Sequence, residues 1–251
     1  MSPYSGPRSS VCMATYNGER YVVEQVRSIL DELLPDDELV VVDDASTDST
    51  LAMLDAIGDE RIRIIRSSRN SGYVRAFETA IASARGERIF LADQDDVWIP
   101  GRMALMSAAL EHAAVVVGNC EHFGGALTPF LRLRLRSSDS RHHARNILGI
   151  LVGYRLHWGA AMAFRAEFRR LALPFPTGMT ESHDQWIALA GNVARSIRYL
   201  DEDVVRHRLH QRNVTPRTIR RPAMILRARW QFVAELLIAL RRDRALRRRG
   251  R

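Results

Sequence analysis

The sequence predicts an α/β protein with a mainly parallel central sheet flanked by helices. Two observations predict this class. Short apolar runs alternate with stretches whose apolar residues recur every three to four positions, and this order repeats as far as Ala92. Parallel strands need such crossover helices, which then cover both faces of the sheet. The 251 residues, 46% hydrophobic and 26% charged, are enough for one large domain or two small ones.

The first half of the chain predicts four strands separated by three helices. Two of the predicted helices end at a residue that disfavours their continuation, the first at Pro35 and the third at Gly86. The expected strands cover Ser9–Ala14, Glu38–Val42, Arg61–Arg66 and Arg88–Ala92, and the expected helices run from after Gly18 to about Leu34, across Leu51, Leu54 and Ile57, and over Ser71–Arg85.

The second half is less regular. The pattern predicts a helix over Met103–Glu111, a strand over Ala113–Val117, a helix over His183–Val193, two short strands within Ser196–Val205 and a long helix over Ala223–Leu246. Residues 121–145 show little periodicity. Within them, Leu131–Arg136 alternates Leu with Arg, which fits an edge strand, a helix turn or a flap.

Charge and composition exclude several classes of function. The net charge is +8, and residues 220–251 carry 11 Arg against Glu235 and Asp243, so the basic character belongs to the C-terminal segment. All 37 basic residues are Arg, which excludes lysine chemistry such as a Schiff base or a phosphate-binding Walker lysine. Two cysteines and no signal-peptide pattern predict reduced thiols and a cytoplasmic location.

Polar side chains follow three of the predicted strands. The first strand is followed by Thr15, Tyr16 and Asn17, the second by Asp43 and Asp44, and the fourth by the run from Asp93 to Asp96. In open α/β sheets ligands bind beyond the carboxyl ends of the strands. We therefore expect these side chains to share one pocket.

The run Asp93-Gln94-Asp95-Asp96 predicts a metal and diphosphate site. Several carboxylates within a few ångströms repel one another unless a cation lies between them. A divalent ion held by one or two carboxylates, with water and phosphate oxygens in its other positions, relieves the repulsion. The alternative is a solvated turn, or a cap for the helix that follows Pro100.

The pair Asp43-Asp44 is a candidate for nucleobase recognition, because a carboxylate accepts a hydrogen bond from the imide N–H of uracil or thymine. The alternative is helix capping before Ser49. At the next strand-to-helix turn, Gly72 permits close backbone approach and Arg75 can reach a phosphate.

These residues resemble the inverting glycosyltransferases of family 2, especially rhamnosyltransferase-like members. The resemblance covers about residues 9–216. It rests on Ala14-Thr15-Tyr16-Asn17-Gly18, Asp43-Asp44-Ala45-Ser46-Thr47-Asp48, Asn70-Ser71-Gly72, Asp93-Gln94-Asp95-Asp96-Val97-Trp98, Gly159-Ala160-Ala161-Met162 (Gly-Cys-Thr-Met in the subgroup), His183-Asp184-Gln185-Trp186 (His-Asp-Trp-Trp in the subgroup), and Arg208, His210 and Asn213. It implies a GT-A fold.

The resemblance also implies roles. Asp44 contacts the nucleobase, Arg75 approaches the diphosphate, Asp95 is the main metal ligand and His210 is the second, a pair that suits Mn more than Mg. Asp184 is the candidate general base for the acceptor hydroxyl. The other expected nucleotide-sugar contacts are Thr15, Tyr16, Asn17, Glu19, Asp43, Asp93 and Gln94, and the expected acceptor or sugar pocket is Trp158, Gly159, Ala160, His183 and Trp186.

The expected domain organisation is a glycosyltransferase domain over residues 1–216 and a basic amphipathic helix and tail over 217–251. Residues 9–100 form the nucleotide-sugar half of that domain, and 101–216 the acceptor half. The donor is a nucleoside diphosphate sugar, either dTDP-rhamnose or a UDP-sugar, and the acceptor is a glycan or a lipid-linked glycan. The Arg-rich helix predicts binding to the anionic inner face of the cytoplasmic membrane, with packing on the domain as the alternative. No nucleic-acid partner is expected.

Two other functions fit parts of the pattern. A sugar-phosphate nucleotidyltransferase uses a similar fold, but it needs a Gly-rich N-terminal loop and a lysine that this chain lacks. A nucleotide-sugar-binding protein without catalysis would bind a donor and never consume it. The neighbours Ser182, His183 and Asp184 do not predict a hydrolytic triad, because adjacent residues point in different directions and no Gly-x-Ser-x-Gly turn is present.

Overall fold

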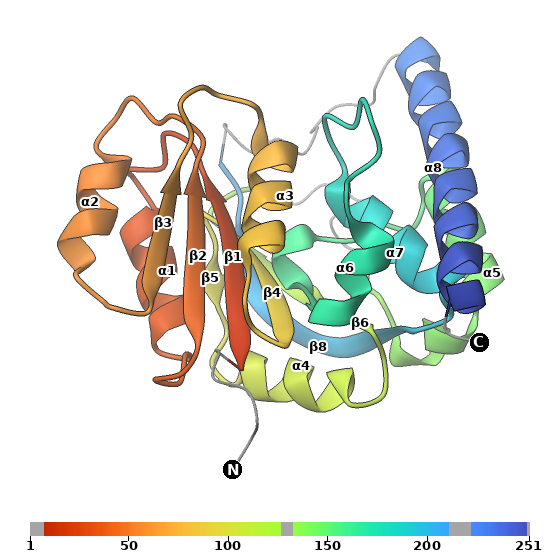
Figure 1. The fold of residues 1–251 in the computed structure, drawn as a ribbon, viewed down its shortest axis with the longest axis horizontal. Coiled ribbons are helices and arrows are strands. Elements are labelled where there is room, and N and C mark those ends of the chain that lie inside the picture. Colours follow the sequence, from red (N-terminus) through yellow and green to blue (C-terminus); the bar gives the residue numbers. More distant parts are fainter. Residues whose placement is uncertain (1–7, 127–132, 211–221, 250–251) are drawn as a thin grey trace.

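The computed structural model describes residues 8–126, 133–210 and 222–249 and has the α/β architecture expected from the sequence (Figure 1). One sheet contains eight strands in the order β3-β2-β1-β4-β7-β6-β8-β5. The strands are β1 Ser9–Thr15, β2 Glu38–Asp43, β3 Ile62–Arg66, β4 Arg88–Asp93, β5 Val97–Trp98, β6 Val115–Phe123, β7 Met162–Arg165 and β8 Ile197–Arg208. The α-helices are α1 Val22–Leu30, α2 Thr50–Ile57, α3 Tyr73–Ser83, α4 Arg102–Leu110, α5 His143–Val152, α6 Arg169–Ala172, α7 His183–Val193 and α8 Pro222–Arg249.

The sheet is parallel in its N-terminal half and mixed beyond it. Strands β1 to β4 pair in parallel, as the strand–helix alternation predicts. β7 then runs antiparallel to both β4 and β6, β6 pairs in parallel with β8, and the two-residue β5 pairs antiparallel with β8. The parallel part places the ends of β1, β2 and β4 at one edge.

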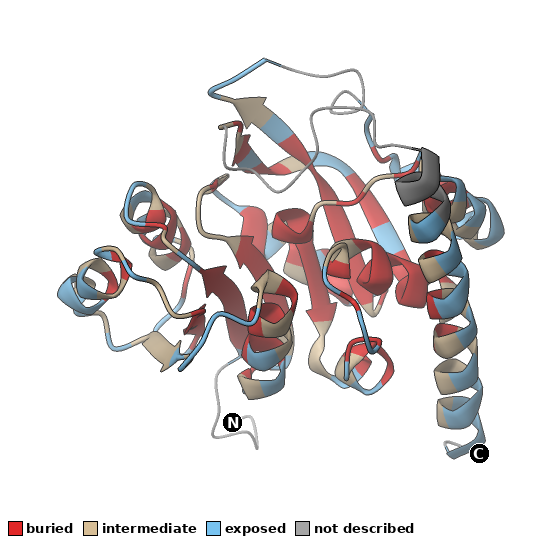
Figure 2. Cartoon of the chain, turned by 90° about the horizontal axis from the view of Figure 1, so that it is seen from above, coloured by how far each residue is buried: buried red, intermediate tan, exposed pale blue. Residues whose placement is uncertain are grey.

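Alternate side chains of the parallel strands enter two separate apolar cores. On β1, Val11 and Met13 pack with α1, α2 and α4, whereas Cys12 packs on the opposite face with α3 and α7. All three side chains are fully buried. This two-sided burial explains why the strands are continuous apolar runs (Figure 2).

The predicted pair of short strands within Ser196–Val205 is wrong, since β8 is one strand of 12 residues. It pairs with β6 across two register shifts, and the polar run Asp201-Glu202-Asp203, which interrupts the apolar pattern, lies inside the strand. β6 likewise extends beyond the predicted Val117 to Phe123. Hydrogen bonding to a neighbouring strand therefore continues both elements past their apolar runs.

Three elements of the second half, α5, β7 and α6, were not predicted. α5 begins within the polar stretch Arg141–Arg145, and β7 and α6 have four residues each, too few for a periodicity to be read. The described part of the Leu–Arg alternation, residues 133–136, is neither helix nor strand, and the Leu135 amide donates to Asn119 Oδ1 at 2.8 Å. Residues 131 and 132 lie outside the described ranges.

The predicted C-terminal helix is present as α8, which packs against α5, α6 and α7 at one side of the molecule (Figure 1). Phe232 and Ala239 are buried in the core shared with α7. None of the helices in the described ranges combines the length and hydropathy needed to span a bilayer.

Candidate active site

The ends of β1, β2 and β4 bring the predicted donor residues together. Thr15 pairs with Asp43 across the sheet, and its hydroxyl donates to Asp43 Oδ1 at 3.1 Å. The Gln94 side chain accepts from the Tyr16 amide at 2.9 Å and donates to the Tyr16 carbonyl at 3.1 Å. Its amide thus extends the backbone pairing of the sheet by one step.

Asp44 holds the turn that begins α3. Its two carboxylate oxygens accept from the Ser71 amide at 2.9 Å and the Gly72 amide at 2.8 Å, and the Ser71 hydroxyl also donates to it. Asp43 in turn accepts from the amide and hydroxyl of Ser46. Both carboxylates are buried and orient loops, and base recognition by Asp44 stays a prediction.

Asn17 and Glu19 join the β1–α1 loop to the β2–α2 loop. Asn17 Oδ1 accepts from the Thr47 amide at 2.8 Å, and Glu19 Oε2 accepts from the Ser49 amide at 3.1 Å. Asn17 adopts a positive φ of 49°, which Asn tolerates better than most residues. These two predicted donor contacts therefore shape the loops, whereas the neighbouring Tyr16 is 45% exposed.

The carboxylates after β4 form an acidic cluster whose pKa values reflect crowding. Burial raises the pKa of Asp93 well above its ordinary value, and the charges of Asp96 and Asp95 raise it further. Burial and the charge of Asp96 also raise the pKa of Asp95, although His210 opposes the shift. A cation would remove this repulsion.

His210, at the far end of β8, contacts Asp95 directly. Its Nε2 lies 2.6 Å from Asp95 Oδ2, and its ring stacks on Tyr21 of the β1–α1 loop with centroids 5.1 Å apart. The neighbouring Arg208 donates from Nε to the Asp95 carbonyl at 3.0 Å. The structure therefore places this histidine against Asp95, and its role as a metal ligand stays a prediction. Asn213 lies outside the described residues.

The residues present fit a divalent cation held mainly by its substrate. Within residues 8–126, 133–210 and 222–249, no group of three or more His, Cys, Asp or Glu side chains is arranged to hold a metal ion. The pair of Asp95 and His210 offers one carboxylate oxygen and one imidazole nitrogen, a donor set that suits Mn. Such a site leaves the other positions to water and diphosphate oxygens.

Asp184 lies in the first turn of α7. Its Oδ1 accepts from the Gln185 amide at 2.7 Å, and the Gly159 amide also donates to the carboxylate. Burial outweighs these hydrogen bonds and raises the pKa of Asp184 to about 7. A carboxylate with this pKa is suited to act as a general base near neutral pH.

Tyr73 connects the Asp44 turn to the Asp184 turn. It is the first residue of α3, directly after Gly72, and its hydroxyl accepts from the Ser182 amide at 3.1 Å. The charge of Asp184 contributes to the raised pKa of both Tyr73 and Asp93. The two predicted halves of the site are therefore adjacent.

The predicted acceptor pocket needs one clear correction. Trp186 is fully buried, and its indole N–H donates to the Ala172 carbonyl at 2.9 Å, so it is a core residue and offers no face to a sugar. Two positions along an α-helix point to different sides, so Trp186 turns away from Asp184. Ala160 is buried in the opposite core.

Gly159, His183 and Trp158 lie nearer to Asp184 and the acids. A Cβ on Gly159 would lie 3.0 Å from His183 Nε2 and 3.7 Å from Asp184 Cβ. The buried His183 ring stacks on Phe77, and burial lowers its pKa to about 3, so it is neutral. Trp158 is partly exposed, and its ring lies 5.2 Å from that of His207.

Arg75, the predicted diphosphate contact, forms an ion pair with Glu78 one turn along α3. Glu78 also accepts from the Phe175 amide at 2.6 Å, so this pair connects α3 to the segment before α7. Arg75 reaches toward that segment in the structure, and its contact with a diphosphate stays a prediction.

The sequence analysis did not predict the residues that form hydrogen bonds with the acidic cluster after β4. Asp96 is fully buried and accepts from the Arg208 amide at 3.0 Å, and its Oδ1 lies 2.9 Å from His207 Nδ1. Although burial disfavours the charged imidazole, Asp96 outweighs this and raises the pKa of His207 to about 9. The Gln25 side chain donates to the Asp93 carbonyl at 2.7 Å. A buried polar residue in an otherwise apolar helix face, as Gln25 is, was the available signal.

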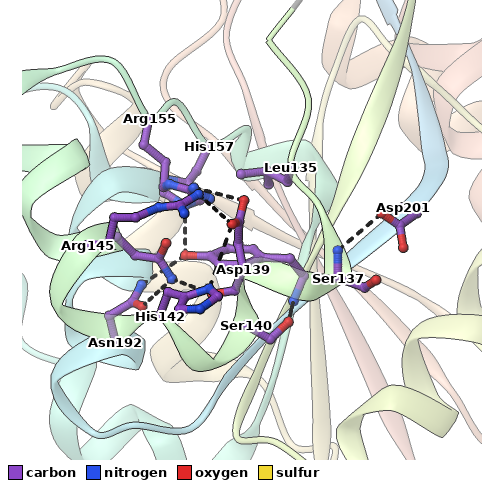
Figure 3. Close-up of polar contacts among 12 residues, drawn as sticks. Leu135, Ser137, Asp139, Ser140, His142, Arg145, Arg155, His157, Asn192 and Asp201 are labelled. Carbon is purple, nitrogen blue, oxygen red and sulfur yellow. Dashed lines mark hydrogen bonds and ion pairs between the residues drawn. The ribbon is translucent and has the colours of Figure 1, made fainter.

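A second missed feature is a polar network around Asp139, which reaches α5 and Asn192 in the last turn of α7 (Figure 3). Asp139 lies at its centre and accepts from Arg145 at 2.7 Å and from Arg155 at 2.9 Å. His157 extends the network to α7, because its Nδ1 lies 2.9 Å from Gln185 Oε1. The residue beside Asp184 is thus fixed by hydrogen bonds.

Comparison with known proteins identifies the family. The family model described as Glycosyl transferase family 2 matches residues 10–170, well over half of the chain. The chain belongs to glycosyltransferase family 2. Its matched region contains β1 to β4, the acidic cluster and Gly159.

Curated relatives agree with this family. The chain is 32% identical over 114 residues to glycosyltransferase GlyG of Streptococcus pneumoniae serotype 4, a match covering 44% of this chain and 38% of GlyG. It is 38% identical over 100 residues to the succinoglycan biosynthesis protein ExoO of Rhizobium meliloti, covering 40% and 29%. It is 29% identical over 114 residues to the UDP-Glc:alpha-D-GlcNAc-diphosphoundecaprenol beta-1,3-glucosyltransferase WfgD of Escherichia coli, covering 45% of each. Each match spans less than half of the relative's own length.

Solved structures agree on the fold. Residues 1–349 of S. aureus TarS in complex with UDP-GlcNAc superpose with a TM-score of 0.70 at 20% sequence identity. The superposition covers 92% of this chain and 66% of that chain. The central sheet with flanking helices is therefore the GT-A fold that the motifs implied.

Proposed function

We propose that this family 2 glycosyltransferase is a metal-dependent inverting enzyme that moves a sugar from a nucleoside diphosphate to an acceptor hydroxyl. The observation that carries the proposal is the meeting of Asp95 and His210 at 2.6 Å. They lie 115 residues apart in the sequence and meet beside Asp93 and Asp96, at the edge where α/β sheets bind ligands. With only these two side chains as protein ligands, a cation would have its other positions open to diphosphate oxygens and water.

The chain's own residues would each carry part of the reaction. Asp95 and His210 would hold Mn or Mg, which when bound stabilises the charge on the departing diphosphate. Asp44 would accept the imide N–H of the base, and Arg75 would exchange Glu78 for a phosphate. Asp184 would take the proton of the acceptor hydroxyl as that oxygen attacks the anomeric carbon, and a single in-line displacement inverts the configuration.

The donor and acceptor are proposed by class. Both uracil and thymine present the same imide edge, so a UDP-sugar and dTDP-rhamnose remain the two donors. The UDP-GlcNAc bound to TarS supports the first, and the likeness to rhamnosyltransferases supports the second. The names of ExoO and WfgD support a role in cell-surface polysaccharide synthesis with a lipid-linked glycan acceptor. With such an acceptor, the enzyme would work at the inner face of the cytoplasmic membrane.

Variants of the two acids test this function. We expect Asp95→Ala and Asp184→Asn each to lower the rate of donor consumption at least a hundredfold, because one removes a metal ligand and the other removes the base. EDTA should abolish turnover of the wild type, and Mn should restore it. The exposed Asp36 provides a matched control, and Asp36→Asn should keep full activity.

Full turnover by either acid variant would contradict the proposed roles. If a nucleotide sugar binds but is never consumed with any glycan or lipid-linked acceptor, the chain is a binding protein. The donor class follows from a thermal-shift screen of uridine and thymidine diphosphate sugars, because specific ligands raise the melting temperature of the native state.

A further inference from the structure

One face of α8 exposes apolar side chains to solvent. Trp230 is 75% exposed, and Val233 and Leu237 are also among the exposed large hydrophobic residues. Their spacing of three and four residues places them on one side of the helix. The opposite side packs on the domain through Phe232 and Ala239. The exposed side chains are therefore not needed to hold α8 in place.

α5, which packs against α8, also exposes apolar side chains. Leu148 and Val152 are more than half exposed, and Tyr154 follows at the end of the helix. Arg229 of α8 joins the two helices, because it donates to the Ile150 carbonyl at 3.3 Å and lies against Gly153. The two helices lie together at one edge of the molecule (Figure 1). We call Leu148, Val152, Tyr154, Trp230, Val233 and Leu237 the apolar face.

Three arginines, which we call the arginine row, lie on the same side of α8 as the apolar face. Arg241, Arg244 and Arg248 are exposed, and their spacing from Leu237 keeps them on the side of the apolar face. The carboxylates of α8 do not offset this charge, because Glu235 is buried and Asp243 is paired with Arg247 at 2.7 Å. α5 contains no Asp or Glu.

α8 is held firmly enough to present this surface as part of the domain. On its inner side, Arg242 donates to the carbonyls of Leu171 at 3.0 Å and Pro174 at 2.7 Å. α8 also packs against α7, the helix whose first turn carries Asp184. α8 is therefore fixed to the helix that carries the candidate base.

We propose that the apolar face and the arginine row dock on an anionic lipid bilayer. Trp, Leu and Val side chains at helical spacing insert at the level of the headgroups, and Arg side chains beside them attract anionic lipid phosphates. A second copy of the chain is a poorer occupant, since the same surface would offer it no acidic partner for the arginines. No helix among the described residues could span the bilayer, so α8 would lie in the plane of the membrane interface.

The location follows from, and rests on, the proposed function. A lipid-linked acceptor lies at the bilayer surface, and docking through α8 would bring the α7 end of the site to it. Docking itself needs neither donor nor acceptor. Vesicle binding can therefore fail while sugar transfer survives, or the reverse, so the two proposals are distinguishable.

Vesicle co-sedimentation of the full chain tests the docking. We expect binding to vesicles of phosphatidylcholine with phosphatidylglycerol, and little binding to phosphatidylcholine alone. Trp230→Ser with Leu237→Ser should weaken binding at least tenfold, and the triple change of Arg241, Arg244 and Arg248 to Gln should do the same. Added salt should weaken the wild type, because it screens the arginines.

Matched controls separate the surface from general effects of charge and hydrophobicity. Leu34→Ser changes an exposed leucine elsewhere, and the triple change of the exposed Arg27, Arg85 and Arg198 to Gln removes the same charge outside α5 and α8. Both controls should bind vesicles like the wild type. Trp230 fluorescence should shift to the blue on binding, and Trp230→Phe should remove that shift.

Equal binding of the α8 variants and their controls would overturn the proposal, and so would absence of binding to anionic vesicles. A stable dimer that Trp230→Ser dissociates, in a chain that ignores vesicles, would assign the face to a second copy instead.

Discussion

Burial of the Asp184 carboxylate destabilises its charged form and gives it a pKa that suits a general base. Its carboxylate is partly buried at the start of α7, and this burial is what raises its pKa to about 7. The hydrogen bonds from Gln185 and Gly159 favour the charged form but do not restore the ordinary value. A base with this pKa changes its charge within the physiological range.

The pH dependence of turnover should follow this group. Since the general base must be deprotonated, kcat/KM should fall tenfold for each pH unit below about 7 and level off above it. The profile is measured with saturating metal. A profile that stays flat between pH 5 and pH 8 would exclude Asp184 as the base.

The same shift predicts a stability change with a definite sign. The unfolded chain releases this proton near the ordinary value of 3.8, and the folded chain holds it until about 7. The free energy of unfolding therefore falls as the pH rises between these values. Asp184→Asn avoids this loss, so at pH 8 it should be more stable than the wild type by roughly 2 to 4 kcal/mol. At pH 3 the variant and the wild type should have the same stability in urea unfolding. If the variant is less stable than the wild type at pH 8, burial of the Asp184 charge does not destabilise the fold.

Gly18 is required by a close contact in the donor loop. A Cβ at this position would lie 2.3 Å from Gln94 Oε1, so Gly18→Ala should expel the side chain that pairs with the Tyr16 backbone. We expect a loss of about 1 to 3 kcal/mol in the free energy of unfolding. In a double-mutant cycle, Gly18→Ala should cause almost no loss in the free energy of unfolding when Gln94→Ala is already present. Additive losses would show that the contact is unimportant.

At the residue scale, the sequence predicted acids better than aromatic residues. Asp95 and His210 meet as the motif implied, because both are polar groups at strand ends. Trp186 was placed in the sugar pocket because it stands in the same motif as Asp184. Its side chain instead enters the core, a distinction that only the direction of each side chain on α7 can make.

At the scale of elements, Asp139 secures α5 and the segment before β7. Its ion pair with Arg155 is largely shielded from solvent, with 7% of the Arg155 side chain and 11% of the Asp139 side chain exposed. Asp139→Asn should leave the Arg155 guanidinium buried without its counter-ion and lower the free energy of unfolding by about 3 kcal/mol.

A more exposed pair provides the control. Asp59 and Arg61 interact at 2.7 Å with a quarter of each side chain exposed, and Asp59→Asn should cost less than about 1 kcal/mol. Urea unfolding measures both variants. Equal losses would mean that burial adds nothing to the Asp139 pair.

The elements predicted correctly are those whose pattern is local. α1, α3 and β1 each carry a complete period in consecutive residues, so their positions were expected to within a few residues. α5 was missed because polar residues precede its apolar part, and β8 was divided because three acidic residues interrupt it. Pairing with β6 decides the length of β8, and that partner is distant in sequence.

At the scale of the whole molecule, the site combines residues that are far apart in the sequence. Asp95 follows β4, His210 follows β8, and Asp184 begins α7. The order of motifs predicted that these residues cooperate, but not the tertiary contacts that hold them. The support of Asp96 by His207 and Arg208, for instance, joins positions more than 100 residues apart.

Ligands that bind across this junction should stabilise the whole fold. At a hundredfold excess over its Kd, a nucleoside diphosphate with Mn should add about 2.7 kcal/mol. For a chain of this size, that corresponds to a rise of roughly 5 to 10 °C in Tm. Differential scanning fluorimetry should show a smaller rise with either component alone. In Asp95→Ala, Mn should add nothing to the effect of the nucleotide, and a full Mn effect there would place the metal elsewhere.

The most direct test is an anomalous difference map, measured at the manganese edge, from crystals grown with Mn and a nucleoside diphosphate. We expect one strong peak within bonding distance of Asp95 and His210 and of a diphosphate oxygen. A map with no peak there, or with the manganese bound away from both side chains, would contradict it.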